Sequence, residues 1–120
     1  MRPTSIALTA VAAALLIAVP ATAAPARHAA KTTTITVGAT EFKFTLSKKS
    51  APKGTVVFKV TNKGKVAHDF KINGKTTPLL KPKKSATLTV KFPKTGKFPY
   101  LCTVPGHAAA GMKGTFTITA

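Results

Sequence analysis

Three side chains that can donate to a soft metal ion lie within eleven residues of one another near the end of the sequence. Cys102, His107 and Met112 share the segment 102–112, with four residues in each of the two gaps between them. A further histidine, His68, lies upstream in the segment 66–70. Two histidines, one cysteine and a weakly bound methionine are the donors of copper sites that transfer electrons. The donor types therefore predict a copper ion.

Taken singly, each of these residues has an ordinary explanation. Buried cysteines and methionines usually fill cores, and most histidines are hydrogen-bonded or solvated. The sequence has only one Cys, three His and two Met, of which Met1 is the initiator, so their concentration in one short segment is informative. Pro105 stiffens this segment, while Gly106, Gly111 and Gly114 permit the backbone conformations that a tight loop around an ion requires.

The same thiol and imidazole suggest a second chemistry. Cys102 and His107 could form a nucleophile pair with Asp69 orienting the imidazole, as in thiol hydrolases. That interpretation gives His68 and Met112 no role and leaves a thiolate open to oxidation. We therefore expect a metal site and no enzyme.

At these residues the sequence resembles the cupredoxins, the small type 1 blue copper proteins of the plastocyanin and azurin type. The matching segments are 66–70 and 100–114, and the two four-residue gaps are most similar to those of the rusticyanins. The resemblance implies that His68, Cys102 and His107 are strong equatorial ligands and Met112 the weak axial one. It covers residues 32–120. Family members often carry Asn after the first histidine, to tie the two ligand segments together, and this chain has Asp69 there.

The first residues have the features of an export signal. Arg2 supplies a positive start, residues 6–19 are apolar and uncharged, and residues 21–23 form a small-residue cleavage pattern. The apolar run is shorter than the roughly 20 residues of a membrane span. We expect a signal peptide at 1–23, a disordered spacer at 24–31 with a solvated His28, and a copper domain at 32–120. A single cysteine in an exported protein has no internal disulfide partner, and copper would occupy its thiol.

From Thr32 onward the hydrophobic pattern has period two, which is typical of half-buried strands. Turn residues such as those at 52–54, 62–64, 73–74 and 95–96 separate the alternating runs. The pattern predicts an all-β fold, a Greek-key β-sandwich of seven to eight strands, with the copper site at one pole. The alternating apolar residues are Ile35 and Val37; Phe42, Phe44 and Leu46; Val56, Phe58 and Val60; Val66, Phe70 and Ile72; Leu88, Val90 and Phe92; Phe98 and Tyr100; and Phe116 and Ile118.

The parity of two strands places two of the donors. His68 shares parity with Val66, Phe70 and Ile72, so we expect it to face the core. Cys102 shares parity with Phe98 and Tyr100 and should also face inward. Asp69 would then point outward. If these two strands are neighbours, both donors lie at the same pole of the sandwich.

The charge balance indicates the kind of partner. Lys and Arg number 19 against two acids, Glu41 and Asp69, for a formal net charge of +17, or +16 once Arg2 leaves with the signal. Such a field attracts acidic redox partner proteins and an anionic cell envelope. The lysines are scattered over strands and turns, and no nucleic-acid-reading module is recognisable. We expect a monomer with no transmembrane segment after signal removal, in the periplasm or outside the cell.

These observations favour an exported type 1 copper protein that carries single electrons between redox partners through a Cu(I)/Cu(II) centre. Two alternatives remain open from the sequence. One is a copper sequestration or delivery protein of the cell envelope. The other is a polycationic surface-binding module whose metal site is structural.

Overall fold

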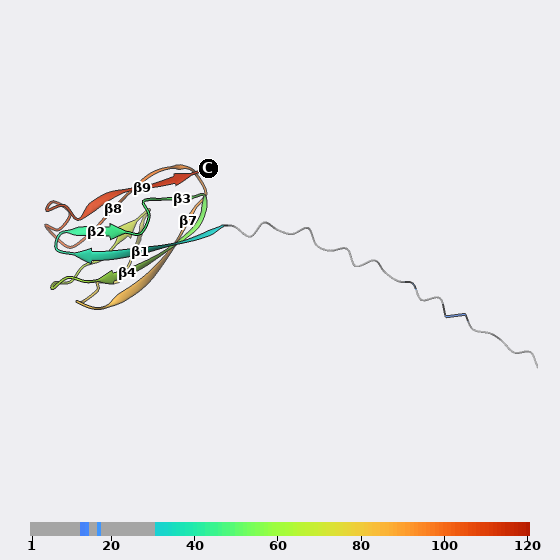
Figure 1. Ribbon diagram of the computed structural model, residues 1–120, viewed down its shortest axis with the longest axis horizontal. Coiled ribbons are helices and arrows are strands. Elements are labelled where there is room, and N and C mark those ends of the chain that lie inside the picture. The colour runs from blue at the N-terminus through green and yellow to red at the C-terminus, as the bar shows by residue number, and fades with distance from the viewer. Residues whose placement is uncertain (1–12, 15–16, 18–30) are drawn as a thin grey trace, which may run out of the picture.

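The computed structural model describes residues 13–14, 17 and 31–120. The predicted signal peptide and spacer therefore lie almost wholly outside the described residues. Nine strands form two facing sheets (Figure 1). The described residues include no helix with the length and hydrophobicity of a membrane span. The strands are β1 (Thr32–Thr40), β2 (Lys43–Leu46), β3 (Ser50–Pro52), β4 (Gly54–Asn62), β5 (Lys71–Ile72), β6 (Lys75–Thr76), β7 (Ser85–Phe92), β8 (Gly96–Leu101) and β9 (Lys113–Thr119).

The first sheet has four strands in the order β2-β1-β4-β7. β1 runs parallel to β4, and both pair antiparallel with their outer neighbours β2 and β7. Ile35, Val37 and Ala39 of β1 are buried, while Thr34 and Thr36 alternate with Ile35 and Val37 on the solvent side. This alternation is what a sheet with one solvated face requires.

The second sheet has five strands in the order β3-β9-β8-β5-β6. β8 pairs antiparallel with β9 on one side and with β5 on the other, in the register Lys71↔Leu101 and Ile72↔Tyr100. In this register the residues that precede β5 lie beside the residues that follow β8. The two predicted donor segments are therefore neighbours.

Aromatic side chains fill the space between the sheets. Phe58 of the first sheet lies 5.2 Å from Phe70 and 5.3 Å from Phe116 between ring centroids, and both partners belong to the second layer. Phe70 also packs on Tyr100. Such ring pairs add to the large area that each ring buries. Because Phe70 follows His68 by two residues, this core anchors the donor segment. The all-β sandwich predicted from the sequence is confirmed.

The prediction that residues 66–73 form one strand is mostly wrong. Only Lys71 and Ile72 form a strand, and His68, Asp69 and Phe70 are all buried in succession. Val66, expected in the core, is 44% exposed, and Asp69, expected to point outward, is buried. His68 instead forms an isolated bridge with Leu80, which turns the chain out of the regular two-residue alternation.

Phe42 also departs from its predicted place. It lies in the turn between β1 and β2, outside the strand, and its side chain is 42% exposed. The described residues contain nine strands, more than the seven to eight expected, because β3, β5 and β6 are pieces of only two or three residues.

The sequence predicted that Gly106, Gly111 and Gly114 all permit a tight loop, but Gly114 has a packing role instead. Gly106 and Gly111 have φ of 83° and 120°, as expected for a tight loop. Gly114 lies within β9 opposite Tyr100, and a Cβ there would collide with the Tyr100 ring.

We expect Gly114→Ala to destabilise the fold by about 1–3 kcal/mol, the usual cost of overpacking. Gly38→Ala in β1 is the matched control, since a Cβ there meets only the flexible Lys63 side chain at 3.6 Å. Urea unfolding of the two variants measures the difference. Equal stabilities would show that the Tyr100 ring moves aside freely.

Candidate metal centre

Three donor atoms converge at one end of the sandwich. The Nδ1 atoms of His68 and His107 are 3.1 Å apart, and Cys102 Sγ lies 3.6 Å from His107 Nδ1. All three donor atoms lie within 4.8 Å of one another. His68 and Cys102 are fully buried, and His107 is half-buried. Both inward-facing predictions are thus confirmed.

The loop 102–112 is closed by its own backbone. The Cys102 N–H donates to the Met112 carbonyl at 3.0 Å, and the Met112 N–H donates to the His107 carbonyl at 3.0 Å. Further turns link His107 to Val104 and Ala110 to Gly106. These bonds hold the three predicted donors of the loop on one small rigid turn.

Met112 lies at the base of this loop with no exposed surface. It forms a small buried cluster with Cys102 and Ala39 of β1, separate from the main aromatic core. A thioether beside the thiol is the placement that a weak fourth donor needs.

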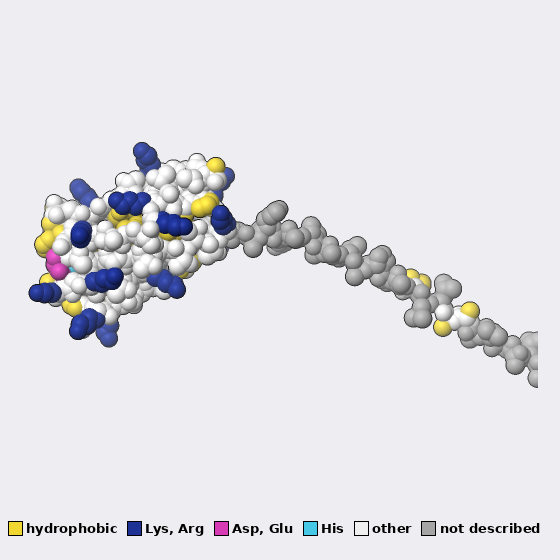
Figure 2. Space-filling view, viewed as in Figure 1, with side chains coloured by type: hydrophobic (Ala, Val, Ile, Leu, Met, Phe, Trp, Pro, Cys, Tyr) yellow, Lys and Arg dark blue, Asp and Glu magenta, His cyan; other side chains and the backbone are white. Residues whose placement is uncertain are grey.

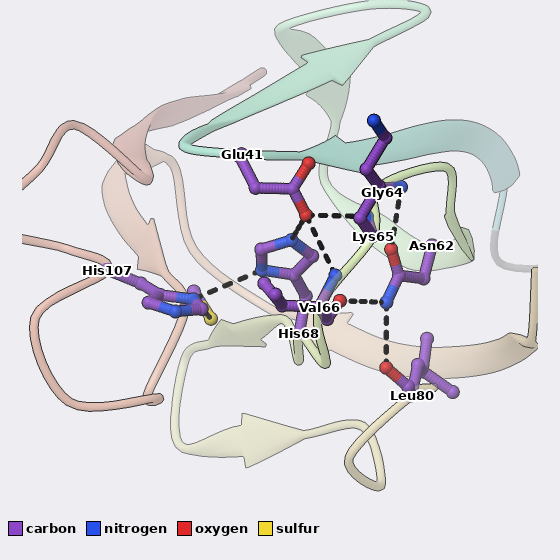
Figure 3. Close-up of polar contacts among 9 residues, drawn as sticks. Glu41, Asn62, Gly64, Lys65, Val66, His68, Leu80 and His107 are labelled. Carbon is purple, nitrogen blue, oxygen red and sulfur yellow. Dashed lines mark hydrogen bonds and ion pairs between the residues drawn. The ribbon is translucent and has the colours of Figure 1, made fainter. Parts of the chain in front are cut away.

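The backbone around His68 is held from two sides. His68 and Leu80 exchange backbone hydrogen bonds of 3.0 and 2.8 Å. The buried Asn62 amide donates to the carbonyls of Leu80 and Val66, at 2.8 and 2.7 Å, and its oxygen accepts from the Gly64 N–H at 2.8 Å. Asn62 therefore fixes both the loop before His68 and Leu80, the bridge partner of His68 (Figure 3).

Sequence reasoning missed Glu41. Its Oε1 accepts hydrogen bonds from the backbone N–H groups of Lys65 and Val66, at 2.7 and 3.0 Å, and lies 3.1 Å from His68 Nε2. The donating N–H groups of Val66 and Lys65 lower the pKa of Glu41 to about 2. The one feature of the sequence that could have drawn attention to Glu41 is that it is one of only two acidic residues in a strongly basic chain.

His107 reaches the surface among apolar neighbours. The exposed Phe42 ring meets the His107 ring edge-on, with 5.1 Å between centroids. Val104 and Ala108 beside His107 are half-buried, while Pro105 and Ala109 are exposed. Apolar loop residues thus surround His107 at the surface, and Phe42 adds an aromatic ring to them.

Asp69 is the tie between the two donor segments. One carboxylate oxygen accepts from the Thr103 backbone N–H at 2.6 Å, and the other accepts from the Thr103 hydroxyl. Its burial and these bonds assign it a structural role in place of an exposed docking charge. Because Asp69 binds Thr103, it is not the orienting partner of His107 that the hydrolase interpretation required.

Burial raises the pKa of the Cys102 thiol, which disfavours a free thiolate nucleophile. A bound metal has the opposite effect, since coordination deprotonates a thiol outright.

The donor set fits copper. Two nitrogens bonded to one tetrahedral metal at about 2.0–2.1 Å lie roughly 3.4 Å apart, close to the separation of the two Nδ1 atoms. Thiolate and thioether donors select Cu(I), and imidazole accommodates copper in general. The His107 Nδ1 atom lies near both the His68 Nδ1 atom and the Cys102 Sγ atom, as donors to one shared ion would.

Residues 8–118 match the cupredoxin-like domain family, and the chain belongs to this family. Copper is the metal of the family, in agreement with the donor set of this chain.

Individual relatives agree with this assignment. Auracyanin-B of Chloroflexus aurantiacus is 46% identical over 43 residues, which are 36% of this chain and 18% of that protein. The match therefore spans less than a fifth of the curated relative. The structure of dithionite-reduced auracyanin from Roseiflexus castenholzii superposes with a TM-score of 0.66 at 24% identity, over 73% of this chain and 98% of that one. The structure of rusticyanin from Thiobacillus ferrooxidans superposes with a TM-score of 0.63 at 24% identity, over 74% of this chain and 78% of that one. These structures share the fold.

The tie between Asp69 and Thr103 predicts a graded mutational result. Asp69→Ala leaves the Thr103 N–H without its acceptor, which we expect to cost about 1–3 kcal/mol of stability. Asp69→Asn keeps an acceptor oxygen and should cost less. Chemical unfolding of the metal-free variants measures both, and an equal loss for Ala and Asn would show that the carboxylate charge matters more than the hydrogen bond.

Proposed function

We propose that this protein is an exported electron carrier that binds one copper ion through His68, Cys102, His107 and Met112. The observation that carries the proposal is the convergence of one ligand atom each from His68, Cys102 and His107 within 4.8 Å, with the two Nδ1 atoms 3.1 Å apart. The buried Met112 beside Cys102 supports its assignment as the fourth, weak donor. Copper supplies a one-electron couple between Cu(I) and Cu(II) when bound.

The residues of the chain account for the other requirements of electron transfer. Asn62, Asp69 and the self-bonded loop hold the donors in one arrangement, so that little needs to move when an electron arrives or leaves. The Cys102 thiol gives up its proton when a metal binds. His107 is the half-buried donor, and its apolar surroundings offer a dry contact through which a partner protein can exchange electrons.

The site has the character of a carrier site more than of a catalytic or delivery site. Cys102 and Met112 have 1% and 0% of their surface exposed, which leaves substrate or a competing chelator little access to them. A copper delivery protein would need rapid release of the metal. We therefore propose that the protein is not an enzyme and that it retains its copper.

Partners and location follow from charge and from the first residues. Among residues 31–120 the one recorded ion pair joins His68 and Glu41, so the lysines there are not neutralised by carboxylates. Figure 2 shows lysines spread over the visible face, with acidic atoms only at the end where apolar atoms also gather. This supports acidic redox partners at an anionic cell envelope, and the predicted signal peptide supports export.

Copper loading tests the site directly. The protein with Cu(II) should show an intense visible thiolate-to-copper band that reductant bleaches reversibly, and Cys102→Ala should abolish it. His28→Ala is the matched control, because we expect that third histidine to be solvated, and its band should be unchanged. A band of wild-type strength in Cys102→Ala would rule out the thiolate ligand.

The charge predicts a specific salt dependence. The rate of oxidation by an anionic reagent such as ferricyanide should fall as salt is raised from 0.01 to 0.5 M, while oxidation by a cationic cobalt(III) complex should accelerate. The reason is that the Debye length shrinks from about 30 Å at 0.01 M to about 10 Å at 0.1 M. Electrostatic steering of this kind changes association rates by roughly 10- to 1,000-fold. Stopped-flow kinetics measures both reactions, and the same salt dependence for both reagents would contradict steering by the lysines.

A further inference from the structure

The turn between β1 and β2 touches both histidines of the centre from outside. Glu41 lies on the side of the His68 ring away from His107, and Phe42 contacts the His107 ring (Figure 3 for Glu41). The Glu41 side chain is 31% exposed, so it lies at the boundary between the buried site and solvent. No other described carboxylate forms an ion pair with a histidine.

The hydrogen bonds of Glu41 indicate which atom donates at its contact with His68. An ionised carboxylate only accepts hydrogen bonds, and the two backbone N–H donors keep Glu41 ionised. The contact with His68 Nε2 at 3.1 Å is therefore an Nε2–H donating to the carboxylate. In the neutral imidazole this leaves Nδ1 unprotonated, and Nδ1 is the atom that lies 3.1 Å from His107 Nδ1.

The surrounding backbone is shaped to hold the carboxylate in this position. Gly64 lies so close that a Cβ there would collide with the Glu41 carboxylate. Gly64 is itself fixed by the Asn62 side chain, whose amide also holds Val66. Glu41 is thus packed against a loop that is bonded on both of its sides, and its distance to His68 is set by the fold.

We propose that Glu41 is a positioning and tuning residue of the copper centre, holding His68 in the tautomer that presents Nδ1 and stabilising Cu(II) relative to Cu(I) through its negative charge. This inference rests on the proposed copper site. A carboxylate bonded to the outer nitrogen makes a ligating imidazole a stronger donor, and loss of such a partner typically costs 10- to 100-fold in metal affinity. The extra negative charge favours the more positive oxidation state, so Glu41 lowers the reduction potential.

Glu41→Gln separates the charge from the hydrogen bond. The amide oxygen can still accept from His68 Nε2–H and from the Lys65 and Val66 N–H groups, so the variant should fold and keep the visible band. We expect the affinity for Cu(II) to fall about tenfold more than that for Cu(I), which corresponds to an upward shift of about 59 mV in the potential of a one-electron couple. Protein-film voltammetry and separate titrations of the two copper ions measure this.

Ser50→Lys is the control for net charge. Like Glu41→Gln, it raises the charge of the chain by one. Ser50 lies in β3 opposite Thr117 of β9. Thr117 follows Met112 by five residues, which is roughly 17 Å along a strand. That distance exceeds the Debye length of about 8 Å at physiological salt. We expect its potential to match wild type. A Glu41→Gln potential equal to that of Ser50→Lys would overturn the tuning role.

A second readout needs no copper. In the metal-free protein, the ¹⁵N spectrum of the His68 ring should show the Nε2–H tautomer, and Glu41→Ala should lose that preference or speed the exchange of the Nε2 proton. An Nδ1–H tautomer in the wild type would overturn the positioning role.

If the wild type lacked the visible band while the tautomer was as expected, the copper proposal would fail and the Glu41–His68 contact would stand. A blue wild type with an unchanged Glu41→Gln potential would leave the copper proposal intact and refute the tuning.

Discussion

The antiparallel pairing of β5 with β8 is the constraint on which the centre depends. Continuing the register past Lys71↔Leu101 places Phe70 beside Cys102 and Asp69 beside Thr103. The backbone ladder stops there, and the Asp69 carboxylate replaces it by binding the Thr103 N–H and hydroxyl. The strand pairing and this side-chain tie together bring a histidine from one segment to a cysteine from another 34 residues away. Phe70 secures the same segment in the aromatic core.

The donors are held rigidly by hydrogen bonds to backbone groups, and few side chains take part in these bonds. The segment 102–112 closes on itself between Cys102 and Met112, and the buried Asn62 side chain supplies three bonds that hold the segment before His68 and its partner Leu80. A buried polar side chain with all these bonds made is stable, while a partly bonded one would be costly. The arrangement suits a centre whose geometry must be the same in two oxidation states.

The distribution of charge separates two functions. Both side-chain carboxylates of the chain, Glu41 and Asp69, lie at the centre and are engaged in hydrogen bonds there. Lysines are scattered over the face that Figure 2 shows, and they remain available to attract anionic partners. Negative charge near the predicted ligands and positive charge elsewhere can therefore act independently, the first on the metal and the second on association.

The sequence by itself determined the all-β class, the inward positions of His68 and Cys102, and the donor cluster in 102–112, because alternation and donor identity are local properties of the chain. It did not determine the break in alternation at 68–70, the exposure of Val66 and Phe42, the burial of Asp69, or the contact of Glu41 with His68. Those depend on bonds between residues far apart in the chain, such as His68 with Leu80 and Glu41 with Lys65 and Val66. Only the tertiary structure decides such contacts, because a hydrogen bond that closes a long loop competes with, and here overrides, the two-residue period of a strand.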